Sequence, residues 1–146
     1  MIEVEKALPE NALVFAAMEQ ASDTKDYILP YALAEHIQKM LDPNIVYLRI
    51  LHENALAGFF ILSLDPDGTS IEFRRVVVSV KGRGIGQAAI RAMEQFCRTE
   101  LNRQRIWLDV FEHNHRGRHI YKKLGYEKYG ESTSEGKRLL LYQKQL

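Results

Sequence analysis

The stretch that decides the fold is residues 76–87, which read VVVSVKGRGIGQ. A run of valines ends at Ser79, glycines alternate at positions 82, 84 and 86, and a helix-like pattern begins at Gly84. Valines favour a strand, and glycines let the backbone approach a ligand closely. The stretch therefore predicts a strand, a glycine loop and a helix start, and a helix N-terminus of this kind suits a pyrophosphate.

Two common phosphate motifs do not match this loop. A P-loop needs Gly-Lys followed by Ser or Thr, whereas Gly86 is followed by Gln87. The dinucleotide fingerprint needs G-x-G-x-x-G, whereas these glycines alternate. Lys81 and Arg83 add positive charge beside the glycines, which favours an anionic ligand. A glycine-rich turn without any ligand is the alternative that the loop alone leaves open.

The patterns on both sides of this stretch predict a mixed α/β fold. Turn residues and apolar periodicity divide the chain into alternating elements. Strands are expected at 2–6, 45–51, 55–64, 70–79, 105–111, 126–131 and 138–145. Helices are expected at 9–20, from after the turn-rich stretch 21–30 to about 40, at 84–101 and at 114–124. A strand meander followed by a crossover helix predicts one mixed sheet of about seven strands with helices on both faces.

Composition limits the classes of protein that the chain can represent. Its 146 residues fit one domain, 1–146, and the formal net charge of +1 gives no reason to expect nonspecific nucleic-acid binding. The single cysteine, Cys97, excludes an intramolecular disulfide. The longest apolar run, 55–64, is too short to cross a bilayer. We therefore expect a cytoplasmic protein without a membrane or nucleic-acid partner.

A second informative segment is residues 107–126, WLDVFEHNHRGRHIYKKLGY. Asn114 has the side chain of a helix N-cap and Gly125 that of a helix terminator. Tyr121 is then either a half-buried helix aromatic or a phenol that the helix delivers to a pocket.

The two segments, in this order and separation, resemble the GNAT superfamily of N-acetyltransferases. The family's loop reads Arg/Gln-x-x-Gly-x-Gly/Ala, and residues 81–86 fit it except that Lys81 holds the first position. Lysine keeps the charge but cannot make the bidentate contact of arginine. The family's second motif, Asn-x-x-Ala, Tyr, Leu-Gly-Phe, is matched by Asn114, Tyr121, Leu124, Gly125 and Tyr126, with Gly117 in place of alanine.

The resemblance implies a site for acetyl-CoA between two strands that splay apart. The pantetheine is expected on the backbone of two strand residues, and the pyrophosphate on the amides of the glycine loop. No metal and no covalent enzyme intermediate is required. The expected cofactor-binding residues are Val76, Val78, Lys81, Gly82, Arg83, Gly84, Ile85, Gly86, Gln87, Asn114 and Tyr121.

Glu72 is the candidate for the base that takes the proton of the acceptor amine, directly or through water. Its even spacing from Val76 and Val78 predicts that it lies on the same face of the strand, and some family members use a glutamate of this strand as the base. The alternative is a carboxylate paired with Arg74 or Arg75.

Tyr121 is the candidate for the acid that protonates the departing CoA thiolate, since the resemblance places a tyrosine there and an ordinary phenol keeps its proton at neutral pH. A strand N–H near Val78 is the corresponding candidate for the oxyanion donor. Together these residues predict transfer of an acetyl group to a primary amine by direct attack on the thioester.

Other functional classes remain open at this point. One is a non-catalytic CoA-binding or sensing module of the same fold, and another is a metal-binding protein that uses His113, His115 and His119. The basic residues within 116–123 give weak support to a third class, a nucleic-acid-binding protein. The acceptor is not determined, although Asp23, Asp26, Tyr27, Tyr31 and Glu35 suit a cationic amine, and a homodimer is compatible with the resemblance.

Overall fold

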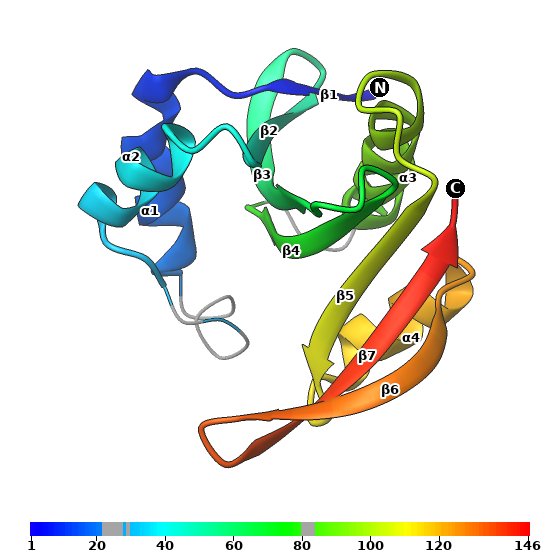
Figure 1. Cartoon of the computed structure of the whole chain (residues 1–146). Coiled ribbons are helices and arrows are strands. Elements are labelled where there is room, and N and C mark those ends of the chain that lie inside the picture. The colour runs from blue at the N-terminus through cyan, green and yellow to red at the C-terminus, as the bar shows by residue number, and fades with distance from the viewer. Residues whose placement is uncertain (22–27, 29, 80–83) are drawn as a thin grey trace.

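A seven-stranded sheet forms the centre of the protein, in the strand order β1-β2-β3-β4-β5-β7-β6 (Figure 1). This computed structural model describes residues 1–21, 28, 30–79 and 84–146. Neighbouring strands are antiparallel except for β4 and β5, which run parallel. The predicted mixed sheet with helices on both faces is therefore confirmed.

The elements follow the predicted order with small changes at their ends. The strands are β1 (Ile2–Lys6), β2 (Ile45–His52), β3 (Ala55–Leu64), β4 (Ser70–Val78), β5 (Arg105–Phe111), β6 (Glu127–Ser134) and β7 (Lys137–Gln145). The helices are α1 (Ala12–Glu19), preceded by a 3-10 turn at Pro9–Asn11, α2 (Leu33–Met40), α3 (Ile85–Thr99) and α4 (His115–Lys123).

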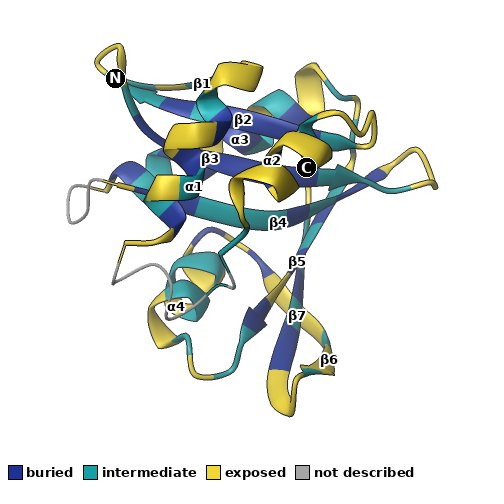
Figure 2. Ribbon diagram, turned by 90° about the vertical axis from the view of Figure 1, so that its left-hand side faces the viewer, coloured by how far each residue is buried: buried dark blue, intermediate teal, exposed yellow. Residues whose placement is uncertain are grey.

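Two apolar cores lie on opposite faces of the sheet. Burial of apolar side chains is the main force that fixes the helices to the strands. The larger core joins the sheet to α3 and α4, with Met93 and Leu124 among its members. The smaller core joins the sheet to α1 through the fully buried Phe15. In Figure 2, α1 and α2 lie in front of β2 and β3 while α3 lies behind them.

A glycine in β3 brings the next strand unusually close. Gly58 is aligned with Val78, and a Cβ on Gly58 would lie 2.1 Å from the carbonyl oxygen of Val77. Only glycine permits this approach, so it interrupts the apolar run of β3 for a structural reason. The contact helps to hold the end of β4, where the glycine loop begins.

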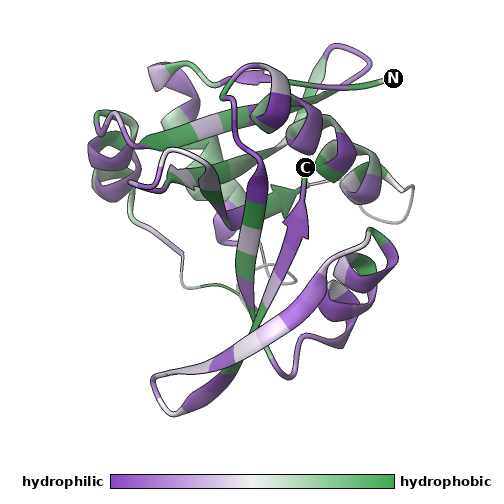
Figure 3. Cartoon of the chain, turned by 45° about the vertical axis from the view of Figure 1, so that its right-hand side comes forward, coloured by the Kyte–Doolittle hydropathy of each residue, from purple (hydrophilic) through white to green (hydrophobic). Residues whose placement is uncertain are grey.

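The edge strand β6 is mostly exposed and, among the described residues, pairs with β7 alone. Figure 3 shows the hydrophilic colouring along it, as expected for a strand that faces water. No helix within the described residues is long and apolar enough to span a membrane.

Candidate active site

The parallel strands β4 and β5 separate soon after they begin. They pair only at Ser70–Glu72 with Arg105–Trp107. Beyond Glu72, β4 continues to Val78 along β3, and beyond Trp107, β5 continues to Phe111 along β7. We call this separation the divergence; it is visible in Figure 1. Within the part of the chain that the structure describes, the facing edges of the two strands have no strand partner there, so their backbone groups are available to an extended ligand.

The start of α3 has the features of an anion site. Gly84 is the N-cap residue with φ of +69°, a left-handed conformation that favours glycine, and no described side chain caps the helix. The first helical hydrogen bond runs from the Ala88 N–H to the Gly84 carbonyl, which leaves the amides of Ile85, Gly86 and Gln87 without a helical acceptor. A Cβ on Gly84 or Gly86 would meet no described atom within 4 Å. The residues present therefore fit a pyrophosphate.

Three of the predicted cofactor residues, Lys81, Gly82 and Arg83, lie outside the described residues. The predicted strand and helix that flank them are present, with β4 ending at Val78 and α3 beginning at Ile85. The Ile85 side chain is buried in the larger core, so only its backbone is suited to a ligand.

Asn114 caps α4, as the sequence predicts. Its side-chain oxygen accepts a hydrogen bond from the Gly117 N–H at 3.0 Å. A Cβ on Gly117 would lie 2.8 Å from the Asn114 amide nitrogen. The glycine that replaces the family's alanine therefore leaves room for the capping side chain. Its helix-propensity cost of about 0.5–1 kcal/mol is at least partly offset.

Tyr121 lies at the divergence. Its ring meets Phe73, the first β4 residue after the last β4–β5 pair, edge to face at a centroid distance of 5.8 Å, and Tyr126 at the same distance. The side chain is half-buried, and its hydroxyl makes no hydrogen bond with any described residue. Burial, and secondarily the charge of Asp109, raises the pKa of Tyr121 to about 12. The phenol therefore keeps its proton throughout the neutral range.

The expectation that Glu72 shares a face with Val76 and Val78 is wrong. The register between β3 and β4 shifts at a bulge, since Leu62 is aligned with Phe73 but Ile61 with Arg75. The extra residue, Arg74, reverses the alternation of side chains. Val76 and Val78 pack against the larger core, on the side of α3.

Glu72 is instead aligned with Ser63, on the face covered by α1 and α2. Its side chain is 14% exposed, and one carboxylate oxygen accepts hydrogen bonds from Arg74 Nη2 at 3.0 Å and Nε at 3.3 Å. Glu72 and Tyr121 therefore approach the divergence from opposite faces of the sheet.

A buried polar network on the α1–α2 face was not predicted from the sequence. The Glu19 carboxylate accepts hydrogen bonds from His36 Nε2 at 2.6 Å and from Arg75 Nη1 at 2.7 Å. His36 Nδ1 lies 2.7 Å from the Tyr47 hydroxyl. Burial alone would raise the pKa of Glu19, but its hydrogen bonds, led by His36 and Arg75, lower it. The sequence holds one signal that Glu19 is buried, because Glu19 follows the buried Phe15 by four residues and so shares its helix face.

The network also holds one of the residues considered for acceptor binding. The Tyr31 N–H donates a hydrogen bond to the Glu19 carboxylate at 3.0 Å. The centroid of the Tyr31 ring lies 4.1 Å from Arg75 Cζ and 4.7 Å from Lys39 Nζ, so both cations contact the ring. Glu35 accepts a hydrogen bond from the Ala32 N–H at the start of α2. Asp23, Asp26 and Tyr27 lie outside the described residues.

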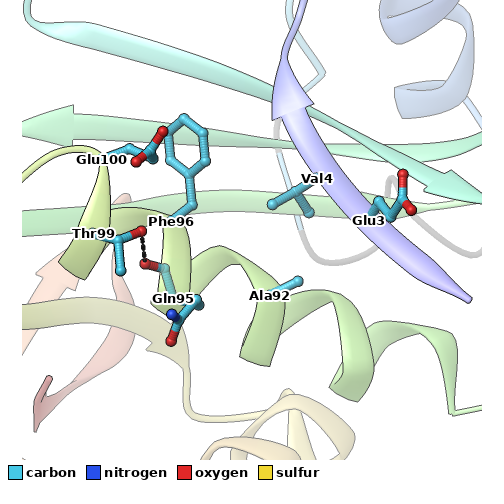
Figure 4. Close-up of a pocket in the computed structure, with 7 residues that line it drawn as sticks. All are labelled: Glu3, Val4, Ala92, Gln95, Phe96, Thr99 and Glu100. Atoms are coloured by element: carbon cyan, nitrogen blue, oxygen red, sulfur yellow. Dashed lines mark hydrogen bonds between the residues drawn. The ribbon is translucent and has the colours of Figure 1, made fainter.

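A groove between β1 and α3 lies apart from the divergence (Figure 4). Its lining residues are Glu3, Val4, Ala92, Gln95, Phe96, Thr99 and Glu100. It contains no predicted site residue. Within the part of the chain that the structure describes, no three His, Cys, Asp or Glu side chains come together as a metal site.

The fold is shared with solved structures of known proteins. The structure superposes on the aminoglycoside acetyltransferase AAC(6')-Ib in complex with coenzyme A with a TM-score of 0.85 at 13% identity, covering 99% of this chain and 95% of that one. It superposes on the Vibrio cholerae spermidine N-acetyltransferase in complex with CoA and spermine with a TM-score of 0.83 at 16% identity, covering 99% of this chain and 95% of that one. For a GNAT-family acetyltransferase of Streptococcus pneumoniae the TM-score is 0.77 at 16% identity, and the match covers 100% of each chain.

At these identities the solved structures show a shared fold. No curated protein sequence matches the chain. Residues 13–126, however, match the family model described as Acetyltransferase (GNAT) family. Because that match spans most of the sequence, the chain belongs to the GNAT family of acetyltransferases.

Proposed function

We propose that residues 1–146 form a single domain that transfers an acetyl group from acetyl-CoA to a primary amine. The observation that carries the proposal is the divergence of β4 and β5, with the uncapped start of α3 at the end of β4 and Tyr121 beside Phe73. Structurally similar proteins bind CoA and act on an aminoglycoside or on spermidine, which supports an amine acceptor. A cytoplasmic location belongs to the proposal and accords with the one buried, free cysteine, Cys97.

The proposed cofactor site combines one strand edge with one helix start. The pantetheine lies along the backbone of Val76 and Val78, and the pyrophosphate meets the amides of 82–87, with Lys81 and Arg83 adding charge. The open space at Gly84 and Gly86 supports this arrangement. Asn114 contributes by capping α4, the helix that carries Tyr121.

Tyr121 is the proposed acid for the departing sulfur. The acceptor nitrogen forms a bond to the thioester carbonyl carbon, the carbon–sulfur bond breaks, and the phenol donates a proton to the sulfur. The proton that the nitrogen loses as it becomes the amide restores the phenol. A pKa of about 12 keeps the phenol protonated before the reaction, and the absence of a described hydrogen-bond partner leaves its O–H available. A phenol that is held among aromatic rings donates without reorganising.

Glu72 is the proposed base, acting through water. Its position on the α1–α2 face supports approach of the amine from the side opposite Tyr121. The bond to Arg74 uses only one carboxylate oxygen, Oε1, which leaves Oε2 for a water molecule. The competing interpretation is that the ion pair with Arg74 is the only role of Glu72.

A turnover screen tests the proposal against its alternative, a non-catalytic CoA-binding module. Acetyl-CoA at 100 times its Kd should stabilise the fold by about 2.7 kcal/mol, whereas NADH and ATP should stabilise it much less. Release of free CoA with spermidine, kanamycin or a peptide with a free N-terminus would support acetyl transfer. Binding without turnover of any amine in a broad panel would favour the non-catalytic module, and tighter binding of NADH or ATP would contradict the proposed site.

A further inference from the structure

Asp109 is a carboxylate whose position at the divergence has no role in the mechanism above. It lies on β5, two residues after Trp107, and the last pair between β4 and β5 joins Trp107 to Glu72. Side chains two residues apart on a strand share a face. Asp109 is therefore the first residue after the divergence on the face of β5 that corresponds to Glu72, the face covered by α1 and α2.

The two carboxylates of this face differ in their partners. Glu72 is largely buried and is neutralised by Arg74. Asp109 is exposed, and its side chain makes no hydrogen bond or ion pair with any residue that the structure describes. Among the described residues, a cation that arrives from outside therefore meets no competing cationic partner at Asp109, whereas Glu72 already has one in Arg74.

Asp109 is also electrostatically linked to the candidate acid. Protein atoms around its carboxyl raise the pKa of Asp109, and Arg74 opposes this effect in part. The charge of Asp109 in turn contributes to the raised pKa of Tyr121. Asp109 thus interacts electrostatically with Arg74 of β4 and with the Tyr121 phenol of α4.

We propose that Asp109 binds the ammonium form of the acceptor at the divergence and so selects cationic amines as substrates. This inference rests on the proposed acetyl transfer and adds the residue that recognises the acceptor. A carboxylate–ammonium hydrogen bond is charge-assisted and stronger than a neutral one. It holds the nitrogen beside Tyr121, while the proton of the ammonium leaves to Glu72 through water, as proposed above.

The test is Asp109→Asn, which keeps the shape of the side chain and removes its charge. With spermidine as the probe, KM for the amine should rise about 10–100-fold, the effect of one hydrogen bond to a charged group. KM for acetyl-CoA and the melting temperature should change little. Asp109→Glu should recover part of the loss. Glu3→Gln, an exposed carboxylate on the far edge strand β1, is the matched control and should behave like the wild type.

An unchanged KM for the amine in Asp109→Asn would overturn the inference and leave the proposed function intact. If the wild type acetylates none of the amines, the proposed function fails, and the inference is then judged by binding alone. Spermidine should raise the melting temperature of the CoA-saturated wild type and of Glu3→Gln, but not that of Asp109→Asn. Equal shifts in all three proteins, or no shift in the wild type, would overturn the inference.

Discussion

His36 donates a hydrogen bond to Glu19 at 2.6 Å, and neither side chain is exposed to solvent. Glu19 ends α1, His36 lies in α2, and the second oxygen of Glu19 binds Arg75 of β4 beyond the divergence. A buried carboxylate is costly unless it is paired and hydrogen-bonded, and here three groups, His36, Arg75 and the Tyr31 N–H, bond the Glu19 carboxylate. The Tyr47 hydroxyl bonds the other ring nitrogen of His36. The network therefore ties the two helices to the strand that carries the proposed cofactor site.

Replacing Glu19 with Gln should destabilise the fold by about 3–5 kcal/mol, because Arg75 would keep a charge that is largely buried and no longer paired. Urea unfolding of the variant and the wild type measures the difference. Glu10→Gln, an exposed position in the 3-10 turn, is the control and should lie within about 0.5 kcal/mol of the wild type. Equal unfolding midpoints for all three proteins would refute a stabilising network.

The lowered pKa of Glu19 predicts that the fold loses stability at acid pH. Since the pKa of Glu19 is lower in the folded chain than in the unfolded one, the unfolded state binds more protons as the pH falls. The contribution of the Glu19 carboxylate to the free energy of unfolding should be complete above about pH 4.5 and should disappear as the pH drops through the pKa of Glu19 in the folded chain. The stability difference between the wild type and Glu19→Gln should therefore shrink below about pH 4.5; a constant difference would be the contrary result.

Gly86→Asp should weaken acetyl-CoA binding at least about tenfold, because its carboxylate would enter the space proposed for the pyrophosphate. An acidic residue in the first turn of a helix is otherwise favourable, so the melting temperature should not fall for that reason. Calorimetric titration with acetyl-CoA checks the prediction, and Gly86→Ala separates the effect of the charge from that of the added methyl group. Wild-type affinity in the folded aspartate variant would show that the loop does not hold the cofactor.

Tyr121→Phe should lower kcat by about 10²–10⁴-fold, the usual contribution of general acid–base catalysis. Acetyl-CoA affinity should change much less, because the phenol is needed in the transition state rather than in the bound ground state. The edge-to-face packing on Phe73 should survive the loss of one oxygen. A lower melting temperature with normal turnover of the folded fraction would instead assign Tyr121 a structural role.

Glu72→Gln should reduce turnover most near neutral pH and recover partly at higher pH, where more acceptor amine is already deprotonated. The pH–rate profiles of the variant and the wild type measure this difference. Arg74→Gln frees Glu72 from its ion pair and serves as the matched control for that contact. A uniform loss across the pH range would indicate structural damage, and no loss would leave the ion pair as the only role of Glu72.

The sequence by itself determined the element order, the glycine loop and the family. These features depend on local signals: valines before alternating glycines, apolar periodicity from Ile85 onward and a capping residue at Asn114. Each acts over a few residues, so it can be recognised before any long-range contact is known. The seven strands and the helices on both faces followed from the same patterns and are confirmed.

The tertiary structure decided which side chains face one another. A single bulge residue, Arg74, moved Glu72 to the opposite face from the one that its spacing predicted. Glu19 and His36, 17 positions apart, became partners only when α1 and α2 packed on the sheet. Asp109 lies at the divergence without a hydrogen-bond or ion-pair partner among the described residues because β5 leaves β4 after Trp107. Register shifts and pairings between distant segments arise from packing of the whole chain, and a local pattern does not encode them.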